Sequence, residues 1–477
     1  MMFHTDIARD FLLIEDIIAT KNPTLIGPKA GGIPGMFFGP VWLYIHIPLF
    51  LIGSGNPIVI AYFWVFLVLL SVVSVYFITS KIFNKTSAVI ASLIYSFFAV
   101  TFSTGFTQSF GSVLITPWLV YFMFRYFEKV KTQSLLIALL INGFIYQLQP
   151  AVGMITLPVT LLLSLGFILK KKRYKDLWSY FILLIPFSTY IYFELRHDFL
   201  EVRAFIDHFV GTGSPKGERL NAIEFIKNRL DSYLSIIDLV KNGLISHGAF
   251  LILYAFIIFK IIKKQTFEGK RYYLLFFAYI LGFVGITLLY KGILIDYYFW
   301  AFLPLSVIAF AGLYRTIPRV VFAAFAIIIL YTAINAAVSY RNWWESSFTG
   351  KDSSSWRLNK EAAEFIFADS EGDFGYFVYS PDEFGYSARY AMNFTQKMNG
   401  NIGKLCEKEK TMYLIYYPTP EHAKTDPVYW KEVRVNIQKD PLFRRVINDI
   451  TIEKYILSEK EQNVPSDPHI VCNLHFR

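Results

Sequence analysis

The sequence has little charge. Asp, Glu, Lys and Arg make up only 17% of its 477 residues, whereas soluble domains carry about 25%. Hydrophobic residues account for 55% of the chain and aromatic residues for 18%. This composition excludes a protein that is soluble along its whole length, and it predicts an integral membrane protein with a polar part attached.

Cysteine is equally scarce, since only Cys406 and Cys472 occur, and both lie in the polar C-terminal part. They can form one disulfide outside the cytosol, and a single pair supports no inference beyond that bond. The N-terminus carries no signal peptide. Residues 1–36 also contain too many polar, Gly and Pro residues to span a bilayer.

The net charge of +10 does not indicate nucleic-acid binding, because the basic residues lie in short loops between apolar runs. Ten such runs are long enough, or nearly long enough, for a spanning helix. They lie near residues 57–80, 87–106, 109–127, 133–149, 152–169, 175–194, 246–263, 272–290, 296–313 and 319–338.

The loops between these runs alternate in charge, which predicts an orientation. One set is basic and includes "KKKRYK" at 170–175 and "KIIKKQTFEGKR" at 260–271. The other set has few Lys and Arg, as in "STGFTQ" at 103–108 and "YQLQPAV" at 146–152. The positive-inside rule places the basic loops in the cytoplasm of a multi-pass plasma-membrane protein.

Three parts follow from this orientation. Residues 1–56 form a first extracytoplasmic loop with juxtamembrane helices, 57–342 a transmembrane domain with an outer loop at 195–245, and 343–477 a C-terminal extracytoplasmic domain. Within the first part, the stretch 39–53 contains Pro48 and has both flanks outside, which predicts an interfacial or re-entrant helix. A chain that starts outside also predicts a further transmembrane helix upstream of Met1.

The composition becomes that of a soluble domain after Asn342. Strand-like runs, "YFVYS" and "MYLIYYP", lie near the helical run "NKEAAEFIFADS". This mixture predicts a small α/β domain. The predicted fold class is therefore a polytopic α-helical membrane protein of about ten to eleven transmembrane helices, with a small C-terminal extracytoplasmic α/β domain.

The first polar cluster lies in "HTDIARDFLLIEDI", which starts at His4. Asp6 and Asp10 are spaced i, i+4 on one helical face, with Arg9 beside them and Glu15 further on. Such carboxylates can act as a general base or coordinate a divalent metal, and no other cofactor is predicted. The alternative is that Asp6 caps the helix while Asp10 and Glu15 lie on its solvated face.

Three further clusters fall on the same side of the predicted topology. The second is "FELRHDFLEVRAFIDHF", where Glu194, Arg196 and His197 crowd the end of an apolar run. Arg can bind a phosphate and His can transfer a proton, although Arg and His also extend from helix ends to the interface without any such role.

The third cluster, "YKGILIDYYFWAFLP", contains Lys291 and Tyr297, and the fourth, "YQLQP", contains Gln147 and Gln149. An aromatic belt explains the tyrosines equally well, and helix capping or helix–helix contacts explain the amides. Because all four clusters lie on one side, we expect them to converge on one outward-facing cavity.

The stretches "TDIARDFLL…LIGPKAGG…GMFFGPVWLY", "FELRHDF" and "DYYFWAFLP" together resemble membrane glycosyltransferases of the GT-C superfamily. The resemblance covers most of the chain and points to the protein O-mannosyltransferase and lipid A aminoarabinose transferase branch, glycosyltransferase families 39 and 83. It implies an inverting transferase that moves a sugar from a polyprenyl-phosphate donor, held in the lipid bilayer, to an extracytoplasmic acceptor. Protein, a lipid A-like lipid and a cell-envelope glycan all stay open as that acceptor.

The resemblance also implies roles for individual residues. The essential acid of the first outer loop maps onto Asp6, with Asp10 as a second catalytic candidate. Arg196 and His197 match an Arg-His pair near the cavity and are expected to bind the donor phosphate. Further candidates for the phosphate are Lys29, Lys291 and Tyr297, and candidates for the sugar or acceptor are Gln147, Gln149 and Glu194.

Two positions depart from the family pattern. Ile7 follows Asp6 where relatives more often have Glu or Gln, which weakens the case for a metal there. Gln149 stands where relatives often have His. Two other classes of protein remain as alternatives, a transporter or lipid flippase and a non-catalytic envelope scaffold, although a transporter would favour charge within its spans.

Overall fold

The computed structural model describes residues 2–30, 33–102, 107–209, 220–240, 243–348, 353–419 and 426–474. Most of the outer loop predicted at 103–108, and residues 210–219 and 241–242 of the loop predicted at 195–245, lie outside the described residues. The chain divides into two compact units. We call 24–45 with 64–338 the helical unit, and 1–23, 46–63 and 339–477 the terminal unit.

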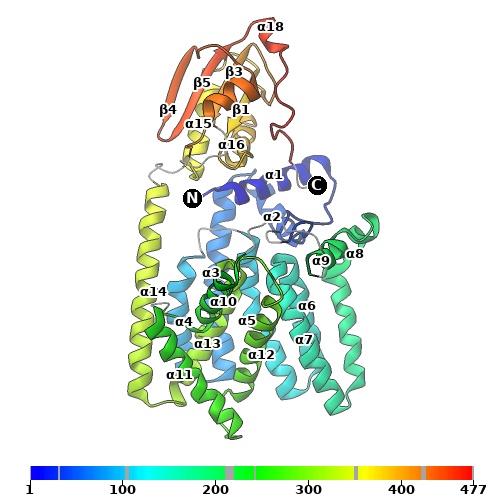
Figure 1. Cartoon of the computed structure of the whole chain (residues 1–477), viewed down its shortest axis with the longest axis vertical. Helices are drawn as coiled ribbons and strands as arrows, with labels where there is room; N and C mark the ends of the chain where they lie inside the picture. Colours follow the sequence, from blue (N-terminus) through cyan, green and yellow to red (C-terminus); the bar gives the residue numbers. More distant parts are fainter. Residues whose placement is uncertain are drawn as a thin grey trace. The chain divides into compact units, whose positions relative to one another are not determined.

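The helical unit is built from helices that follow the apolar runs of the sequence (Figure 1). Two helices at its start, α2 (Val41–Ile52) and α3 (Pro57–Ile82), and the last, α14 (Arg319–Phe348), extend into the terminal unit. The others are α4 (Lys85–Val100), α5 (Gln108–Lys129), α6 (Thr132–Leu148), α7 (Pro150–Lys171), η1 (Tyr174–Leu183), α8 (Leu184–Arg196), α9 (Leu200–Phe209), α10 (Ala222–Ile237), α11 (Gly243–Ile262), α12 (Lys270–Thr287), η2 (Asp296–Tyr298), η3 (Trp300–Phe302), α13 (Leu303–Gly312) and η4 (Leu313–Arg315).

Each of the ten apolar runs is therefore helical over most of its described residues, which confirms a polytopic helical membrane protein. Among the described residues, five helices are long and apolar enough to cross a bilayer unaided, namely α3, α5, α7, α11 and α14. Large apolar side chains such as Leu162, Ile252 and Ile327 are more than two-thirds exposed, as expected of residues that face lipid. The number of ten to eleven spans stays a prediction.

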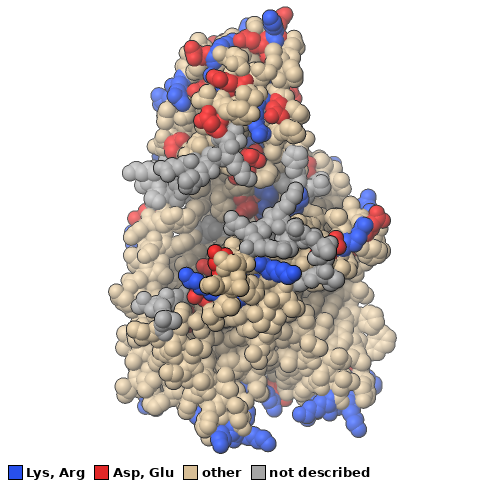
Figure 2. Space-filling view, viewed as in Figure 1, with Lys and Arg blue, Asp and Glu red and all other residues tan. Residues whose placement is uncertain are grey.

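Charge is distributed on the helical unit as the loops predicted. Figure 2 shows a wide band of its surface almost free of charged side chains, with Lys and Arg gathered at one end. At that end α7 gives way to η1 and α11 to α12 (Figure 1). The segments there are the basic loops 170–175 and 260–271.

Buried polar side chains join three of these helices. The Asn142 amide on α6 donates to the Thr160 hydroxyl on α7 at 2.8 Å, and the Thr156 hydroxyl donates back to the Asn142 oxygen at 2.7 Å. The Thr160 hydroxyl also lies 2.8 Å from that of Tyr279 on α12. Such bonds stabilise helix pairs in an apolar surrounding, and here they fix the ends of α6 and α7 where Gln147 and Gln149 lie.

The terminal unit contains the predicted α/β domain. Its five-stranded sheet has the order β2-β1-β3-β5-β4, in which β1 is parallel to β2 and β3, and β5 is antiparallel to β3 and β4. The elements are α15 (Trp356–Asp369), β1 (Phe374–Tyr379), α16 (Tyr386–Gln396), β2 (Gly403–Leu405), β3 (Thr411–Tyr416), α17 (Pro427–Tyr429), η5 (Trp430–Val435), β4 (Phe443–Ile447), β5 (Ile450–Ile456) and α18 (Glu459–Gln462).

The two cysteines form the one disulfide expected of them. Cys406 follows β2 and Cys472 lies in the last segment of the chain, with their Cα atoms 5.9 Å apart. The bond therefore holds the C-terminal segment against the carboxyl end of β2.

The first helix, α1 (Thr5–Thr20), packs on α16 of the C-terminal domain. Phe3 lies at the centre of this contact, with its ring 5.0 Å from that of Trp356 and 5.4 Å from that of Tyr390. The Glu15 carboxylate pairs with the Lys397 ammonium at 2.5 Å. The sequence did not predict that the two ends of the chain share one core. The boundaries at residues 56 and 342 refer to sides of a membrane, and they stay a prediction.

Candidate functional site

A pocket opens in the helical unit beside the start of α7 and the end of α12. Its walls come from three stretches far apart in the sequence, namely 30–38, 149–155 and 286–298. The lining is mostly apolar, with a few polar groups from Gln149, Thr287, Tyr290, Tyr297 and Tyr298. An apolar pocket with few polar groups is the usual form of a small-ligand site. Two of the predicted site residues, Gln149 and Tyr297, meet here.

Gln149 occupies the junction between α6 and α7. Its main-chain N–H still donates to Ile145 at 2.8 Å, and Pro150 starts the next helix at a position where no N–H is needed. The side chain is only 2% exposed, and its Nε2 has no acceptor among the described residues. An unsatisfied buried amide costs about 1–3 kcal/mol. A group that carries this cost beside a pocket is a candidate to bind a ligand oxygen.

Arg229 on α10 holds the wall made by residues 287–294. Its guanidinium is buried and donates to the main-chain oxygens of Thr287 at 3.2 Å, Tyr290 at 2.5 Å and Gly292 at 2.8 Å. The neighbouring Asn228 exchanges two bonds with the main chain of Leu294. Burial lowers the pKa of Arg229, although a guanidinium stays charged in proteins.

The wall that contains Ile33, Met36 and Phe38 is flanked in sequence by two Gly-Pro pairs, at 27–28 and 39–40. Gly27 donates to the Phe38 oxygen at 2.8 Å, and Phe38 donates to the Pro28 oxygen at 2.9 Å. A Cβ on Gly27 would lie 2.8 Å from the Gly39 oxygen, and one on Gly39 would lie 2.6 Å from the side chain of Gln147. The motif "GP…GP" is therefore needed where two chain segments approach too closely for any side chain.

Gln147, a predicted sugar or acceptor ligand, is occupied with holding this wall. Its main-chain oxygen accepts from Gly39 at 2.7 Å, and its side-chain oxygen accepts from Val41 at 3.2 Å. Its amide nitrogen donates to the oxygen of Pro186. All the groups of this side chain are thus bonded within the protein, and the sugar contact stays a prediction.

Glu194 and Glu201 form a buried carboxylate pair behind the same wall. Glu194 accepts from the main-chain N–H groups of Glu201 at 3.0 Å and Val202 at 3.2 Å, in the first turn of α9. Glu201 accepts from Phe37 at 3.0 Å. Burial, and then the charge of Glu194, raise the pKa of Glu201 to about 8. These bonds give Glu194 a structural position, and its predicted ligand role stays a prediction.

Arg196 and His197 lie at the exposed end of α8 and do not line the pocket that holds Gln149. The Arg196 guanidinium lies over the ring of Tyr192 at 5.5 Å, and the His197 imidazole stacks on Phe193 at 4.1 Å. This is the geometry of the alternative in which both side chains extend from a helix end. Their role in phosphate binding stays a prediction.

The two predicted lysines are exposed and flank the pocket in sequence. Lys29 precedes the lining residue Ala30, and Lys291 follows the lining residue Tyr290. His208 on α9 stacks on Tyr290 at 5.6 Å, and burial followed by the charge of Lys291 lowers its pKa. Positive charge therefore lies beside the tyrosines of the pocket.

The two acids that the sequence predicts to be catalytic, Asp6 and Asp10, belong to the terminal unit and share one cation. Arg9 donates to the Asp6 carboxylate at 2.8 Å and to that of Asp10 at 2.9 Å. Burial works to lower the pKa of Arg9, and the charges of Asp10 and Asp6 outweigh it and raise that pKa. The side chain of Asp6 is 55% exposed, whereas that of Asp10 is 6% exposed. Asp6 is thus the acid that solvent and solutes can reach.

The alternative in which Asp6 caps the helix is wrong. The helix begins at Thr5, its cap position is His4, and Asp6 lies inside the first turn, where the helix dipole favours negative charge. Asp10 is buried and Glu15 is ion-paired, so neither lies on a solvated face. The proposal that these acids share a cavity with Arg196 and His197 stays a prediction.

Among the described residues, no group of three or more His, Cys, Asp or Glu side chains is placed to hold a metal ion. The carboxylates of Asp6 and Asp10 converge on the guanidinium of Arg9 instead. This arrangement does not fit a divalent metal site.

Arg229 and Glu201 were missed by the sequence-based reasoning. For Arg229 a signal exists, because Arg229, Ser232 and Ile236 recur at helical spacing and form the buried face of α10. An arginine on the buried face of an amphipathic helix needs acceptors, and main-chain oxygens supply them. For Glu201 no local pattern distinguishes it from its exposed neighbours.

The apolar helices, the pocket among them and the small α/β domain define a polytopic membrane protein with an apolar pocket. Residues 39–193 match the sequence model of the dolichyl-phosphate-mannose-protein mannosyltransferase family. No curated protein matches the chain in sequence.

In fold, the chain is similar to ArnT from Cupriavidus metallidurans in the apo state, with a TM-score of 0.58, 10% identity, and 95% of this chain and 94% of that chain covered. The structure of the same ArnT bound to undecaprenyl phosphate has a TM-score of 0.56 and 8% identity, and again 95% of this chain and 94% of that chain are covered. The predicted resemblance to GT-C glycosyltransferases of the ArnT and protein mannosyltransferase type is thereby confirmed.

Proposed function

We propose that this protein transfers a sugar from a polyprenyl-phosphate donor to an acceptor on the extracytoplasmic face of the cell membrane. The observation that carries this proposal is the match of residues 39–193 to a family of lipid-phosphate-sugar-dependent mannosyltransferases. The similarity in fold to ArnT, which was also solved with undecaprenyl phosphate bound, agrees with it. The acceptor is a hydroxyl of a protein, an envelope lipid or a glycan.

The pocket of the helical unit suits the donor in its chemistry. Its apolar walls can accept the first isoprene units of the lipid, while the rest of the tail stays in the bilayer. At its edge the Gln149 amide and the hydroxyls of Tyr290 and Tyr297 offer donors to a phosphate oxygen. Lys29 and Lys291, each next to a lining residue in sequence, supply positive charge in this proposal.

Catalysis in this proposal rests on stabilising the charge of the leaving phosphate. The acceptor oxygen attacks the anomeric carbon, and the bond from that carbon to the phosphate oxygen breaks on the opposite face, so the configuration inverts. Polyprenyl phosphate leaves with the bonding electron pair, and hydrogen-bond donors set in place before the reaction stabilise its charge with little reorganisation.

The proton of the acceptor passes to a carboxylate, for which we propose Asp6. Its side chain is exposed, and one of its oxygens is held by Arg9 at 2.8 Å. Asp10 is the positioning residue, because its buried carboxylate accepts from both the Nε and Nη2 groups of Arg9. In this scheme Asp10 fixes the guanidinium, and the guanidinium fixes Asp6.

The decisive experiment measures transfer of radiolabelled sugar from a set of polyprenyl-phosphate sugars in membranes that contain the protein. Transfer by the unchanged protein and its loss by about 100-fold or more in Asp6→Asn support the proposal. The matched control is Asp16→Asn on the same helix, which should transfer at the parent rate. If Asp6→Asn transfers as well as the parent, the assigned base is wrong. If no lipid-linked sugar is a donor, the transfer function itself fails.

A further inference from the structure

The terminal unit contains a second pocket, at the carboxyl ends of the parallel strands β1 and β2. The last two residues of β1 and the loop that follows them as far as Phe384 form one wall, and Leu405 and Cys406 at the end of β2 form another. Trp430 and Arg434 of η5 and the C-terminal segment 469–471 complete it. In α/β sheets, ligands bind outside the carboxyl ends of parallel strands. The pocket lies in the place where such a sheet offers a binding site.

Two arginines line this pocket, and neither forms an ion pair with a carboxylate in the described part of the chain. Arg389 is only 5% exposed, and it donates to the main-chain oxygens of Cys472 at 2.9 Å and Phe384 at 3.4 Å. Its Nε has no acceptor among the described residues, and burial lowers its pKa. Arg434 is the second arginine. A buried cation without a counter-charge is costly, and an anion in the pocket would offset that cost.

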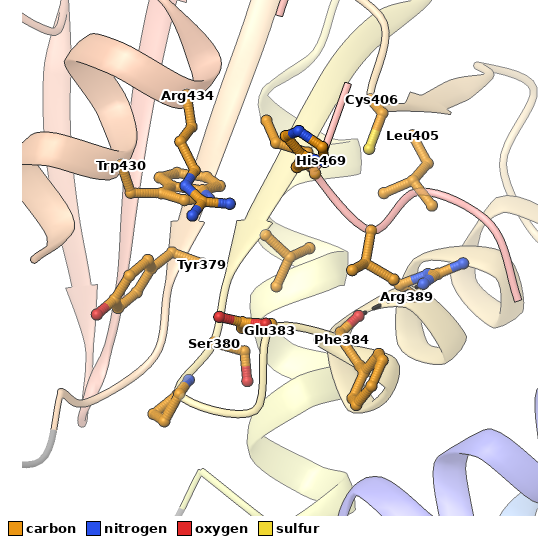
Figure 3. Close-up of a pocket in the computed structure, with 14 residues that line it drawn as sticks. Tyr379, Ser380, Glu383, Phe384, Arg389, Leu405, Cys406, Trp430, Arg434 and His469 are labelled. Atoms are coloured by element: carbon orange, nitrogen blue, oxygen red, sulfur yellow. Dashed lines mark hydrogen bonds between the residues drawn. The ribbon is translucent and has the colours of Figure 1, made fainter. Parts of the chain in front are cut away.

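Aromatic rings also line this pocket. The rings of Tyr379 and Trp430 lie 5.5 Å apart, edge to face, and both residues line the pocket. Figure 3 shows these two rings with Arg434 on one side, and Arg389 with Phe384 on the other. Aromatic rings offer an apolar face with a polar edge, which matches the C–H faces and hydroxyls of a sugar ring.

The loop after β1 is fixed in shape before any ligand arrives. The Asp382 carboxylate accepts from the Ser380 hydroxyl at 2.7 Å and from the N–H groups of Phe384 at 2.9 Å and Gly385 at 3.1 Å. Glu383 takes a left-handed backbone conformation with φ of 64°, which brings it into the lining. The disulfide to Cys472 holds the segment with His469 on the far side. A preformed site lowers the entropy cost of binding.

We propose that this pocket binds an anionic saccharide, that is, a sugar that carries a carboxylate or a phosphate. The arginines bind the anionic group, Trp430 and Tyr379 contact the sugar ring, and Ser380 and Glu383 bond its hydroxyls. The proposal goes beyond the transfer function, because it rests on residues of the terminal unit alone. Its test therefore does not depend on the sugar donor of the proposed transfer reaction.

The test is calorimetric titration of the full-length protein in detergent with four probes: a galacturonic acid trisaccharide, glucose 1-phosphate, maltotriose and inorganic phosphate. We expect at least one of the anionic sugars to bind about tenfold or more tightly than maltotriose and inorganic phosphate. Binding of the uronate alone identifies a carboxylate ligand, and binding of glucose 1-phosphate alone identifies a phosphate ligand. No binding by either anionic sugar, or equal binding by maltotriose or by free phosphate, overturns the proposal.

We choose the variant Arg434→Gln, because the Arg434 side chain is half-buried and its replacement should not destabilise the hydrophobic core. It should weaken binding of the anionic sugar by about tenfold. The matched control is Arg445→Gln on β4, which removes the same charge from an exposed position of the same domain and should bind as the parent does. Equal binding by Arg434→Gln and the parent would place the ligand elsewhere and refute the assignment.

Discussion

The guanidinium of Arg229 donates to the main-chain oxygens of Tyr290 at 2.5 Å and Gly292 at 2.8 Å. It thus joins α10 to the segment that forms one wall of the pocket in the helical unit. Truncation of the Arg229 side chain removes these donors and leaves the main-chain oxygens of the pocket wall unsatisfied. The loss of stability should therefore exceed that expected from the lost side-chain packing alone.

We predict that Arg229→Met lowers the free energy of unfolding by about 3 kcal/mol, because three main-chain carbonyls, one buried and two half-buried, lose their donor. Thermal unfolding in detergent measures this. Lys227→Met on the exposed side of the same helix is the control, and its melting temperature should stay that of the parent. Equal melting temperatures for the two variants would show that the pocket wall at residues 287–294 is not stabilised by Arg229.

Two glycines should respond in opposite ways to the same substitution. In Gly39→Ala the new Cβ would lie 2.6 Å from the Gln147 side chain, so the wall must shift, and we expect a loss of about 2 kcal/mol or more. Gly166 lies within α7, and no atom lies within 4 Å of the place that a Cβ would take there. Gly166→Ala should leave stability unchanged or raise it by up to about 1 kcal/mol. Similar melting temperatures for both would contradict the close approach at Gly39.

The Glu201 carboxyl predicts a pH dependence with a definite sign. Its pKa is raised from 4.5 to about 8 by burial and by Glu194. Between those values the folded state retains a proton that the unfolded state has lost, so stability falls as pH rises from about 4.5 to about 8 and is then level. The loss is a few kcal/mol at most.

Glu201→Gln removes this titration and keeps an oxygen that accepts from Phe37. Melting temperatures measured between pH 5 and pH 9 should therefore fall less steeply with pH in the variant than in the parent. Parallel curves for the two proteins would show that Glu201 does not titrate in this range.

Gln149 and Gln147 lie two residues apart, yet substitutions at the two positions should affect different properties. We expect Gln149 to matter for sugar transfer and Gln147 to matter for stability. Gln149→Leu removes an amide that has no acceptor among the described residues, so folding should be unaffected or improved. If its amide binds the donor phosphate, sugar transfer should fall by about tenfold or more. Measurement of melting and of transfer on the same preparation tests both statements.

Gln147→Leu is the comparison. It loses bonds to Val41 and Pro186, so it should lower the melting temperature together with any loss of transfer. If Gln149→Leu is stable and transfers sugar at the parent rate, Gln149 does not bind the donor. The prediction about its effect on stability would still be confirmed.

The positions of most helices in the helical unit could be predicted from the sequence, because the hydrophobicity of a segment depends only on its own residues. Each apolar run is helical over most of its described residues, and the polar composition after Asn342 predicts a small α/β domain that is present. Cys406 and Cys472 pair because no other cysteines exist. The candidate site was predictable only in part, since Gln149 and Tyr297 line one pocket while Arg196 and His197 lie outside it.

Only the tertiary structure decided which polar residues are buried and what they bond. Glu201 looks like other charged residues on an amphipathic helix, and the spacing that marks Arg229 as buried does not name its acceptors. The bonding partners of these two side chains lie 58 to 164 positions away in the chain. The packing of α1 on α16 likewise joins the two ends of the chain. Membership of a helix is set by neighbours in sequence, whereas burial and bonding partners are set by neighbours in space, and that is why the first could be predicted and the second could not.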